Sequence, residues 1–187
     1  MAEVFDAVVL AGGAARRLGG VDKPSLDVAG RTLLDRVLAA VVDADRVVVV
    51  GPRRTTNVPV DWVREEPPGG GPVAALAAGL TEVTANRVVV LAGDLPFLHA
   101  EHVRQLLASI GETDGALAVD DTGRDQLLVG AWQTARLRAA LPAIAAGARL
   151  GAVLGSLDAA RVALTGAPPP WFDCDTEDDL TTARGMT

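Results

Sequence analysis

The chain has 187 residues, of which 49% are hydrophobic, and a formal net charge of −7 at pH 7. This length predicts one domain over residues 1–187, and the acidic balance excludes generic nucleic-acid binding, which needs a basic face. The single cysteine, Cys174, excludes an internal disulfide, and neither a signal peptide nor an apolar run of transmembrane length is found, so the cytoplasm is the expected compartment.

Short apolar runs alternate with amphipathic segments along most of the chain. Residues 4–11 are apolar without alternation, which predicts a strand buried on both faces. In residues 31–42 apolar side chains recur at helical spacing, which predicts an amphipathic helix packed on a sheet. The further strands expected are 45–51, 60–64, 86–92, 115–119, 127–132 and 161–164, and the further helices are 73–83, 100–110, 134–146 and 149–157. This order predicts an α/β fold with three layers, in which helices cover both faces of a mostly parallel central sheet.

The first strand runs directly into a glycine-rich loop at residues 10–24, LAGGAARRLGGVDKP. Glycines let backbone N–H groups approach an anion closely, and fixed cations neutralise its charge, so the loop predicts a phosphate site. Lys23 is the only lysine among 17 lysine and arginine residues, which favours a functional role for its ammonium over chance placement. The loop is neither a P-loop nor a dinucleotide fingerprint, because Pro24 follows Lys23 and Gly12 is adjacent to Gly13.

The same loop resembles the signature loop of the molybdenum cofactor guanylyltransferase family, L-A-G-G, three residues, R-[ML]-G and then D-K. The residues in register are Leu10, Ala11, Gly12, Gly13, Arg17, Leu18, Gly19, Asp22 and Lys23. The resemblance implies a fold like that of the nucleotide-diphospho-sugar transferases. It also implies catalytic roles for Arg17 and Lys23, which hold the phosphates. The nucleotide-binding residues that it implies in this loop are Leu10, Ala11, Gly12, Gly13 and Lys23.

A second loop, residues 65–72 with the sequence EEPPGGGP, is too rich in proline and glycine for regular structure. In the resembled family a loop of this kind lies over the nucleotide base, and an acid just upstream reads the guanine edge. Alignment on Gly71 and Pro72 makes that acid Glu66, with Glu65 as the alternative because the loop length does not fix the register, and it assigns Gly71 to the nucleotide site. A plain surface loop is the competing interpretation.

Asp94 closely follows the strand expected at residues 86–92. A carboxylate at the carboxyl end of a central strand lies where open α/β sheets bind ligands, and its oxygens together with nucleotide phosphates suit Mg²⁺. The matching aspartate of the family is the metal ligand, so the resemblance implies that Asp94 binds nucleotide and Mg²⁺ and takes part in catalysis. The alternative role for an aspartate at a strand end is a helix N-cap.

The C-terminal segment WFDCDTEDDL, residues 171–180, is similar to the family's ending, an aromatic residue followed by N-x-N-T-P-E. Asp173 and Asp175 stand where asparagines are frequent, and the resemblance places Asp173 on the pterin side and Asp175 on the pterin side or facing the metal. Thr176 and Asp179 have the spacing of a capping box for a final helix. Cys174 is expected to be a small buried side chain.

Two polar features elsewhere receive no site role. His99 and His102 have Glu101 between them but no Cys or third His to complete a metal site, and both are expected on the solvated face of the helix at 100–110. Gln126 and Leu127 occupy positions at which the resembled family often has His-Pro, so Gln126 is given no specific function.

The resemblance implies transfer of GMP from GTP to the molybdenum-bearing molybdopterin cofactor, with release of pyrophosphate. The residues by themselves indicate Mg²⁺-dependent nucleotidyl transfer between two anions, which needs no general base because the attacking phosphate is already ionised. The alternative enzyme is a cytidylyltransferase or sugar-phosphate nucleotidyltransferase on the same fold. The alternative outside the enzymes is an idle nucleotide-binding or scaffold protein that delivers cofactor. Molybdoenzymes or cofactor-delivery proteins are the further partners expected.

Overall fold

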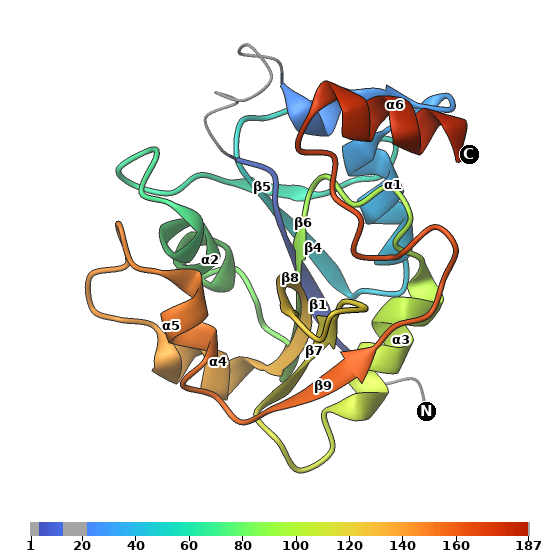
Figure 1. Ribbon diagram of the computed structural model, residues 1–187. Helices are drawn as coiled ribbons and strands as arrows, with labels where there is room; N and C mark the ends of the chain where they lie inside the picture. Colours follow the sequence, from blue (N-terminus) through green and yellow to red (C-terminus); the bar gives the residue numbers. More distant parts are fainter. Residues whose placement is uncertain (1–3, 13–21, 187) are drawn as a thin grey trace.

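The computed structural model describes residues 4–12 and 22–186, and in this part of the chain seven strands form one sheet in the order β5-β4-β1-β6-β8-β7-β9 (Figure 1). The strands are β1 (Asp6–Leu10), β4 (Arg46–Val50), β5 (Asp61–Val63), β6 (Arg87–Ala92), β7 (Gly115–Val119), β8 (Asp125–Gln133) and β9 (Ala159–Ala163). Neighbouring strands are parallel except at β8, which runs antiparallel to both β6 and β7. The expected α/β fold with a mostly parallel sheet is confirmed.

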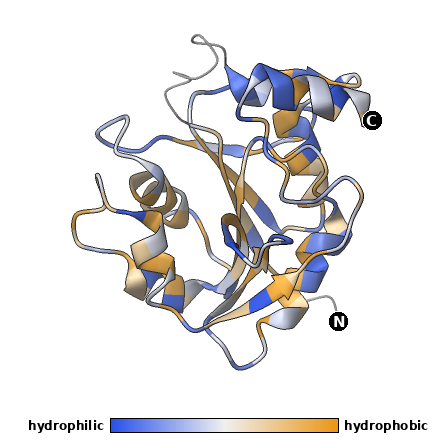
Figure 2. Cartoon of the chain, viewed as in Figure 1, coloured by the Kyte–Doolittle hydropathy of each residue, from blue (hydrophilic) through white to orange (hydrophobic). Residues whose placement is uncertain are grey.

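Helices cover both faces of this sheet. They are α1 (Leu33–Ala40), α2 (Pro72–Leu80), α3 (Ala100–Ser109), α4 (Thr134–Ala140), α5 (Leu150–Leu154) and α6 (Glu177–Gly185), with a 3₁₀ turn η1 (Lys23–Ser25) and a small hairpin of β2 (Asp27–Val28) and β3 (Arg31–Thr32). Successive side chains of a strand point to opposite faces. Ala7 and Val9 therefore join the core beneath α1 and α3, whereas Val8 joins the core beneath α2. The central strands are apolar along most of their length (Figure 2).

The five helices predicted with bounds are all shorter in the structure, α4 by the most. α4 ends at Ala140 rather than 146, because Pro142 drives the residue before it into an extended conformation, and Leu141 has a ψ of 133°. α5 covers Leu150–Leu154 rather than 149–157, and Gly155 forms its C-cap. The residues between the two helices become an irregular connection.

His102 is buried, so the expectation that it faces solvent is wrong. Its side chain is 5% exposed. Its Nδ1 accepts the N–H of His99 at 3.0 Å, and its Nε2 donates to the carbonyl of Thr165 at 3.1 Å. Desolvation lowers the pKa of His102, which keeps the ring neutral. The imidazole thus joins the start of α3 to the segment after β9, a contact across 63 residues that helical spacing could not reveal.

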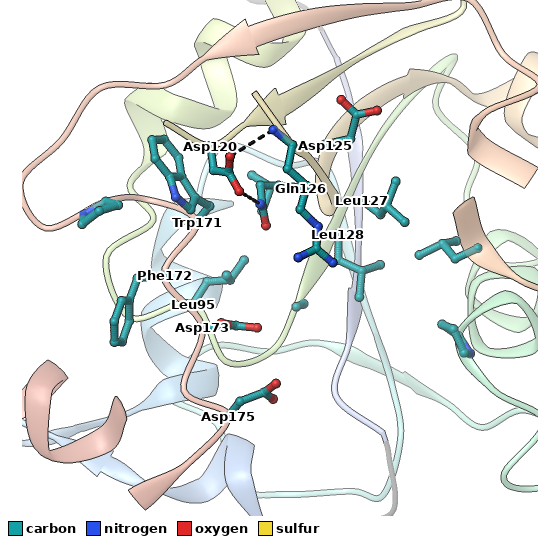
Figure 3. Close-up of a pocket in the computed structure, with 16 residues that line it drawn as sticks. Leu95, Asp120, Asp125, Gln126, Leu127, Leu128, Trp171, Phe172, Asp173 and Asp175 are labelled. Atoms are coloured by element: carbon teal, nitrogen blue, oxygen red, sulfur yellow. Dashed lines mark hydrogen bonds between the residues drawn. The ribbon is translucent and has the colours of Figure 1, made fainter. Parts of the chain in front are cut away.

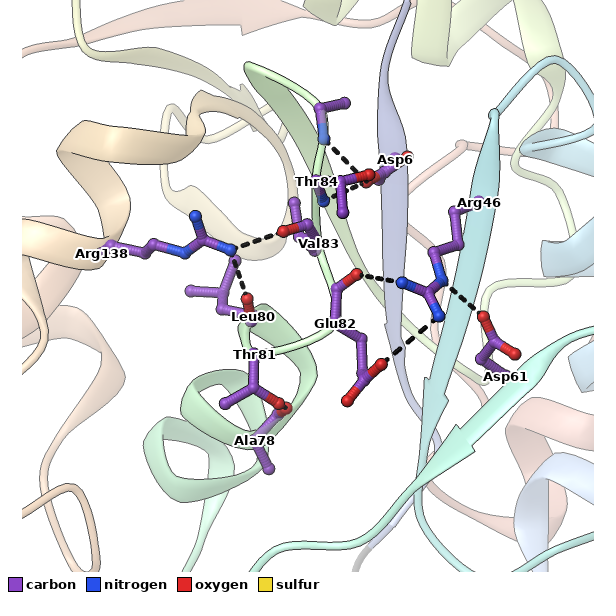
Figure 4. Close-up of polar contacts among 11 residues, drawn as sticks. Asp6, Arg46, Asp61, Ala78, Leu80, Thr81, Glu82, Val83, Thr84 and Arg138 are labelled. Atoms are coloured by element: carbon purple, nitrogen blue, oxygen red, sulfur yellow. Dashed lines mark hydrogen bonds and ion pairs between the residues drawn. The ribbon is translucent and has the colours of Figure 1, made fainter.

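At the amino end of the sheet, Asp6 is fully buried in the first residue of β1 (Figure 4). Its Oδ2 accepts the backbone N–H groups of Thr84 at 2.7 Å and Ala85 at 2.9 Å, which lie just before β6. Its Oδ1 has no hydrogen-bond partner within the described ranges. The carboxylate therefore serves as an internal cap for the turn that enters β6.

Two arginines complete this amino-end network (Figure 4). Arg46 donates to Asp61 at 2.6 Å and to the carbonyl of Glu82 at 2.7 Å. Asp61 first, and more weakly Glu82 and Asp6, raise the pKa of the Arg46 guanidinium. Arg138 donates to backbone carbonyls at the end of α2, those of Leu80 and Val83, each at 2.6 Å. Carbonyl groups that the end of the helix leaves free are thereby bonded.

Candidate functional site

The glycine-rich loop and the Asp94 loop meet because β1 and β6 are parallel neighbours, with Leu10 paired to Ala92. The N–H of Gly93 donates to the carbonyl of Leu10 at 3.0 Å. A Cβ at position 93 would lie 3.1 Å from the Cβ of Ala11, so a side chain there would push the two loops apart. Glycine before Asp94 therefore allows the close approach of the two loops.

Lys23 and Asp94 share one small site, although 71 residues separate them in the sequence. The Nζ of Lys23 lies 3.9 Å from Oδ2 of Asp94 and forms a close ion pair with Asp175. The side chains of Lys23 and Asp94 are 17% and 19% exposed. A backbone hydrogen bond of 3.3 Å from Cys174 N–H to the Asp94 carbonyl holds the C-terminal segment against them. The structure thus brings together residues from three segments that are far apart in the chain.

The charge at this site is unbalanced. Burial is the main reason that the pKa of Asp94 is raised to about 6; the charge of Lys23 opposes this rise, and the charges of Asp173 and Asp175 add to it. Desolvation and the charge of Asp175 also raise the pKa of Asp173. Three carboxylates surround one ammonium, which is an environment that favours a further cation.

The donor chemistry of Asp94 fits Mg²⁺. A carboxylate oxygen is the hard ligand that Mg²⁺ prefers, and this ion commonly keeps waters and phosphate oxygens in its remaining positions. No group of three or more His, Cys, Asp or Glu side chains is arranged to hold a metal ion by itself in the described ranges.

A cavity of about 250 Å³ opens above Lys23 and Asp94. Its lining residues are Leu10, Ala11, Gly12, Asp22, Lys23, Pro24, Arg54, Gly93, Asp94 and Asp175. It therefore contains the sequence-predicted residues of the two loops that the structure describes. Gly13 and Arg17, which the sequence also predicts for this site, lie outside the described residues.

Arg54 is a cavity residue that the sequence analysis missed. Its side chain is 10% exposed, and its Nε donates to Asp22 at 2.7 Å. This hydrogen bond is the main cause of the lowered pKa of Asp22. The pair joins the end of the glycine-rich loop to the segment after β4. The signal available was the Arg53-Arg54 pair just after a buried strand, in a segment interpreted only as a polar turn.

A larger cavity, of about 760 Å³, adjoins the first and shares Asp175 with it (Figure 3). Aromatic and leucine side chains form much of its wall, and polar residues of the β7–β8 turn stand at one side. Its lining includes Leu95, Asp120, Arg124, Gln126, Leu127, Leu128, Trp171, Phe172, Asp173 and Asp175. Asp173 and Asp175 thus both line the larger cavity, and Asp175 forms the border between the two cavities.

The second glycine-rich loop, residues 65–72, contributes little to the two cavities. Pro72, the first residue of α2, lines the larger cavity, and Gly71 precedes it as N-cap with a φ of 90°. The carboxylate of Glu65 accepts the N–H of Gly69 at 3.0 Å, within the loop itself. Glu66 is exposed and lines neither of the two cavities. The structure therefore leaves the predicted base-reading acid outside both.

The C-terminal segment ends in the predicted capping box. The hydroxyl of Thr176 accepts the N–H of Asp179 at 3.1 Å, and the carboxylate of Asp179 accepts the N–H of Thr176 at 2.8 Å. Cys174 is fully buried, as expected, and burial raises its pKa to about 12. Its thiol is therefore a packing group and has no nucleophilic character at neutral pH.

Residues 7–162 match the protein family described as "MobA-like NTP transferase domain". The chain is 33% identical over 195 aligned positions to a molybdenum cofactor guanylyltransferase of Bradyrhizobium sp., with 96% of this chain and 91% of the relative covered. It is 40% identical over 102 positions to a probable molybdenum cofactor guanylyltransferase of Synechococcus elongatus, with 50% and 52% covered.

Two solved structures show the same fold. One is the molybdopterin-guanine dinucleotide biosynthesis protein A of Archaeoglobus fulgidus, with a TM-score of 0.77, 22% identity, and coverage of 96% of this chain and 97% of that one. The other is the 2-C-methyl-D-erythritol 4-phosphate cytidylyltransferase of Thermus thermophilus, with a TM-score of 0.70, 21% identity, and coverage of 95% and 96%. None of the helices in the described residues is long and apolar enough to span a membrane.

Proposed function

Because the chain belongs to the MobA-like NTP transferase family and is a nucleotidyltransferase, we propose that it transfers GMP from GTP to the molybdopterin form of the molybdenum cofactor. The products are pyrophosphate and molybdopterin guanine dinucleotide. Relatives named for this reaction support the choice of donor and acceptor.

The observation that carries the proposal is the position of Lys23, Asp94 and Asp175 at the border of two cavities. The smaller cavity has the size and the backbone of a phosphate site. The larger one, of about 760 Å³, has the volume of a site for a small organic molecule. A donor in one and an acceptor in the other meet at this border, which is the arrangement that transfer between two substrates requires.

The chain's own groups perform positioning and charge neutralisation. The terminal phosphate of the acceptor is anionic at neutral pH, so no base has to remove a proton from it. Lys23 is released from Asp175 when a phosphate takes its place, and its ammonium then stabilises the negative charge that passes to the leaving pyrophosphate. The N–H groups of the glycine-rich loop, including that of Gly12, bind the phosphates, and Arg17 adds a second cation.

Asp94 is the proposed ligand of Mg²⁺. When bound, the ion neutralises phosphate oxygens and supplies Lewis-acid stabilisation of the transferred group. The raised pKa of Asp94 supports this role, because a carboxylate that burial and two neighbouring acids disfavour gains most from a bound cation. Asp173 and Asp175 then face the acceptor side.

At the base end, Glu66 remains the acid proposed to read guanine. Glu65 is engaged by the N–H of Gly69, whereas no hydrogen bond or ion pair of the Glu66 side chain is formed with the described residues. Gly71 and Pro72 begin α2 beside the larger cavity. Movement of this loop over a bound base would bring Glu66 to the nucleotide.

The test is a panel of nucleoside triphosphates. We expect pyrophosphate release from GTP, with Mg²⁺ and molybdopterin present, and none from ATP, CTP or UTP. The second candidate, a cytidylyltransferase, is favoured by the shared fold with the Thermus thermophilus enzyme. Activity with CTP alone, with molybdopterin or with a sugar or polyol phosphate, would reject guanylyl transfer. Nucleotide binding without turnover under every condition would instead indicate an idle binding protein.

A further inference from the structure

The β7–β8 pairing is interrupted beside the larger cavity. Leu117 pairs with Gly130, but the next residue, Ala118, pairs with Gln126. Three residues of β8 therefore have no partner in β7 and form a bulge. They are Leu127, Leu128 and Val129, and all three line the cavity. Such bulges redirect side chains and are frequent next to active sites. The bulge fills one wall of the cavity and places Gln126 at its edge.

Asp120 holds the turn that precedes Gln126 (Figure 3). Its Oδ1 accepts the N–H groups of Thr122 at 2.9 Å and Arg124 at 3.0 Å, and the hydroxyl of Thr122 at 2.7 Å. These hydrogen bonds lower the pKa of Asp120, and the one from the Thr122 hydroxyl contributes most. The carboxylate is therefore ionised at neutral pH and can only accept hydrogen bonds.

The ionised carboxylate of Asp120 fixes the orientation of the Gln126 amide. Its Nε2 donates to Oδ2 of Asp120 at 2.9 Å. Since an ionised carboxylate accepts but does not donate, the NH₂ group must face Asp120 and the carbonyl oxygen must face away from it. Figure 3 shows the oxygen of Gln126 turned away from Asp120. No donor among the described residues bonds to this oxygen, which leaves it available to a ligand.

The rest of the wall favours a flat ring. Trp171 packs against the core, and Phe172 contacts Phe97 with ring centroids 5.7 Å apart. Leu127 and Leu128 add apolar surface from the bulge. Arg124, which also lines the cavity, forms no ion pair with the part of the chain described here, so the cavity offers a cation to an anionic ligand.

We propose that Gln126, oriented by Asp120, is a specificity residue that accepts a hydrogen bond from the amino edge of the acceptor's planar heterocycle. This inference rests on the proposed function, because it takes the larger cavity as the acceptor site. Gln126 contacts the substrate, and Asp120 is a positioning residue that acts through it. A ring with an amino group at that edge is accepted, and a ring with a carbonyl there places two oxygens against each other and is rejected.

A matched pair of probes tests this choice. 6-Hydroxymethylpterin and 6-hydroxymethyllumazine differ at ring position 2, where an amino group is replaced by a carbonyl. We expect calorimetric titration of the full chain to show about tenfold tighter binding of the pterin, the scale of one hydrogen bond at a partly buried site. In Gln126→Leu the ratio of the two dissociation constants should fall to near one.

Asp120→Asn tests the positioning role. Its amide can present NH₂ to Gln126, which allows the glutamine to turn and offer NH₂ to the ligand, so the preference should fall or reverse. Gln133→Leu is the matched control, because Gln133 lies on the same strand but donates to the Thr113 carbonyl, away from the cavity. The control should keep the tenfold preference, and a loss of stability alone would not change the ratio.

The outcomes separate this inference from the proposed function. A preference that persists in Gln126→Leu, or wild-type protein that binds both probes equally or neither, overturns the role of Gln126, even if GTP and molybdopterin still yield pyrophosphate. A preference that Gln126→Leu abolishes supports the role, even if the wild-type enzyme proves to use CTP in place of GTP.

Discussion

The two ends of one sheet hold charged groups in opposite ways. At the amino end, Asp6 accepts two backbone N–H groups, and Arg46 and Arg138 each donate to groups of the same chain (Figure 4). At the carboxyl end, Lys23 faces Asp94 and Asp175, and Asp173 adds a further negative charge. In the first network, most hydrogen-bonding groups already have partners within the protein. The second has an excess of negative charge and gains from a bound cation and substrate, so stability is expected to depend on the first and activity on the second.

The largest expected effect is on activity at the carboxyl end. Lys23→Ala should lower turnover by about 10² to 10³, the scale for loss of one group that stabilises developing charge. The protein should remain folded, because the ammonium serves the site more than the core. Steady-state pyrophosphate release, with circular dichroism as a check on folding, measures this, and Arg31→Ala, at an exposed position outside both cavities, is the control. Turnover equal to wild type would remove the role given to Lys23.

At the amino end the same kind of substitution should affect stability. Asp6→Ala removes the buried carboxylate that accepts the N–H groups of Thr84 and Ala85, which should lower the free energy of unfolding by about 3 kcal/mol. Turnover per folded molecule should change little. Urea unfolding measures the stability, and Asp121→Ala, at an exposed aspartate, is expected to stay within about 0.5 kcal/mol of wild type. An unaltered unfolding midpoint in Asp6→Ala would show that the buried carboxylate is not a structural cap.

Asp94→Asn should change stability and activity in opposite directions. The native pKa of about 6 lies above the ordinary aspartate pKa of 3.8, so the folded state binds more protons between these values and wild-type stability falls as the pH rises from about 4 to 6. The asparagine cannot ionise, so the variant should be more stable than wild type at pH 7 by about 3 kcal/mol.

The same variant should lose activity and show a weaker dependence on Mg²⁺. Thermal unfolding at pH 4, 6 and 7 and a Mg²⁺ titration of turnover test the two halves. A wild-type stability that does not fall over this pH range would contradict the raised pKa. An unchanged metal titration would contradict the assignment of Asp94 as a metal ligand.

Local sequence patterns were sufficient to predict the architecture and part of the site. Apolar runs and helical spacing identified the strands and helices, and parallel β1 and β6 necessarily bring the segments after Leu10 and Ala92 to the same edge. The meeting of Lys23 and Asp94 could therefore be predicted, because Asp94 lies just beyond β6 and Lys23 lies in the loop that follows β1. The capping box of Thr176 and Asp179 was also predictable, because its partners are three residues apart.

Only the tertiary structure determined which distant polar groups meet. Arg54 reaches Asp22 across 32 residues, His102 reaches Thr165 across 63, and Lys23 meets Asp175 across 152. Gln126 acquired its orientation from a register shift that depends on how β8 pairs with both neighbours. The physical reason is that hydrophobic periodicity is encoded locally, residue by residue. The partner of a polar side chain is fixed only when packed strands bring separate loops within hydrogen-bond distance.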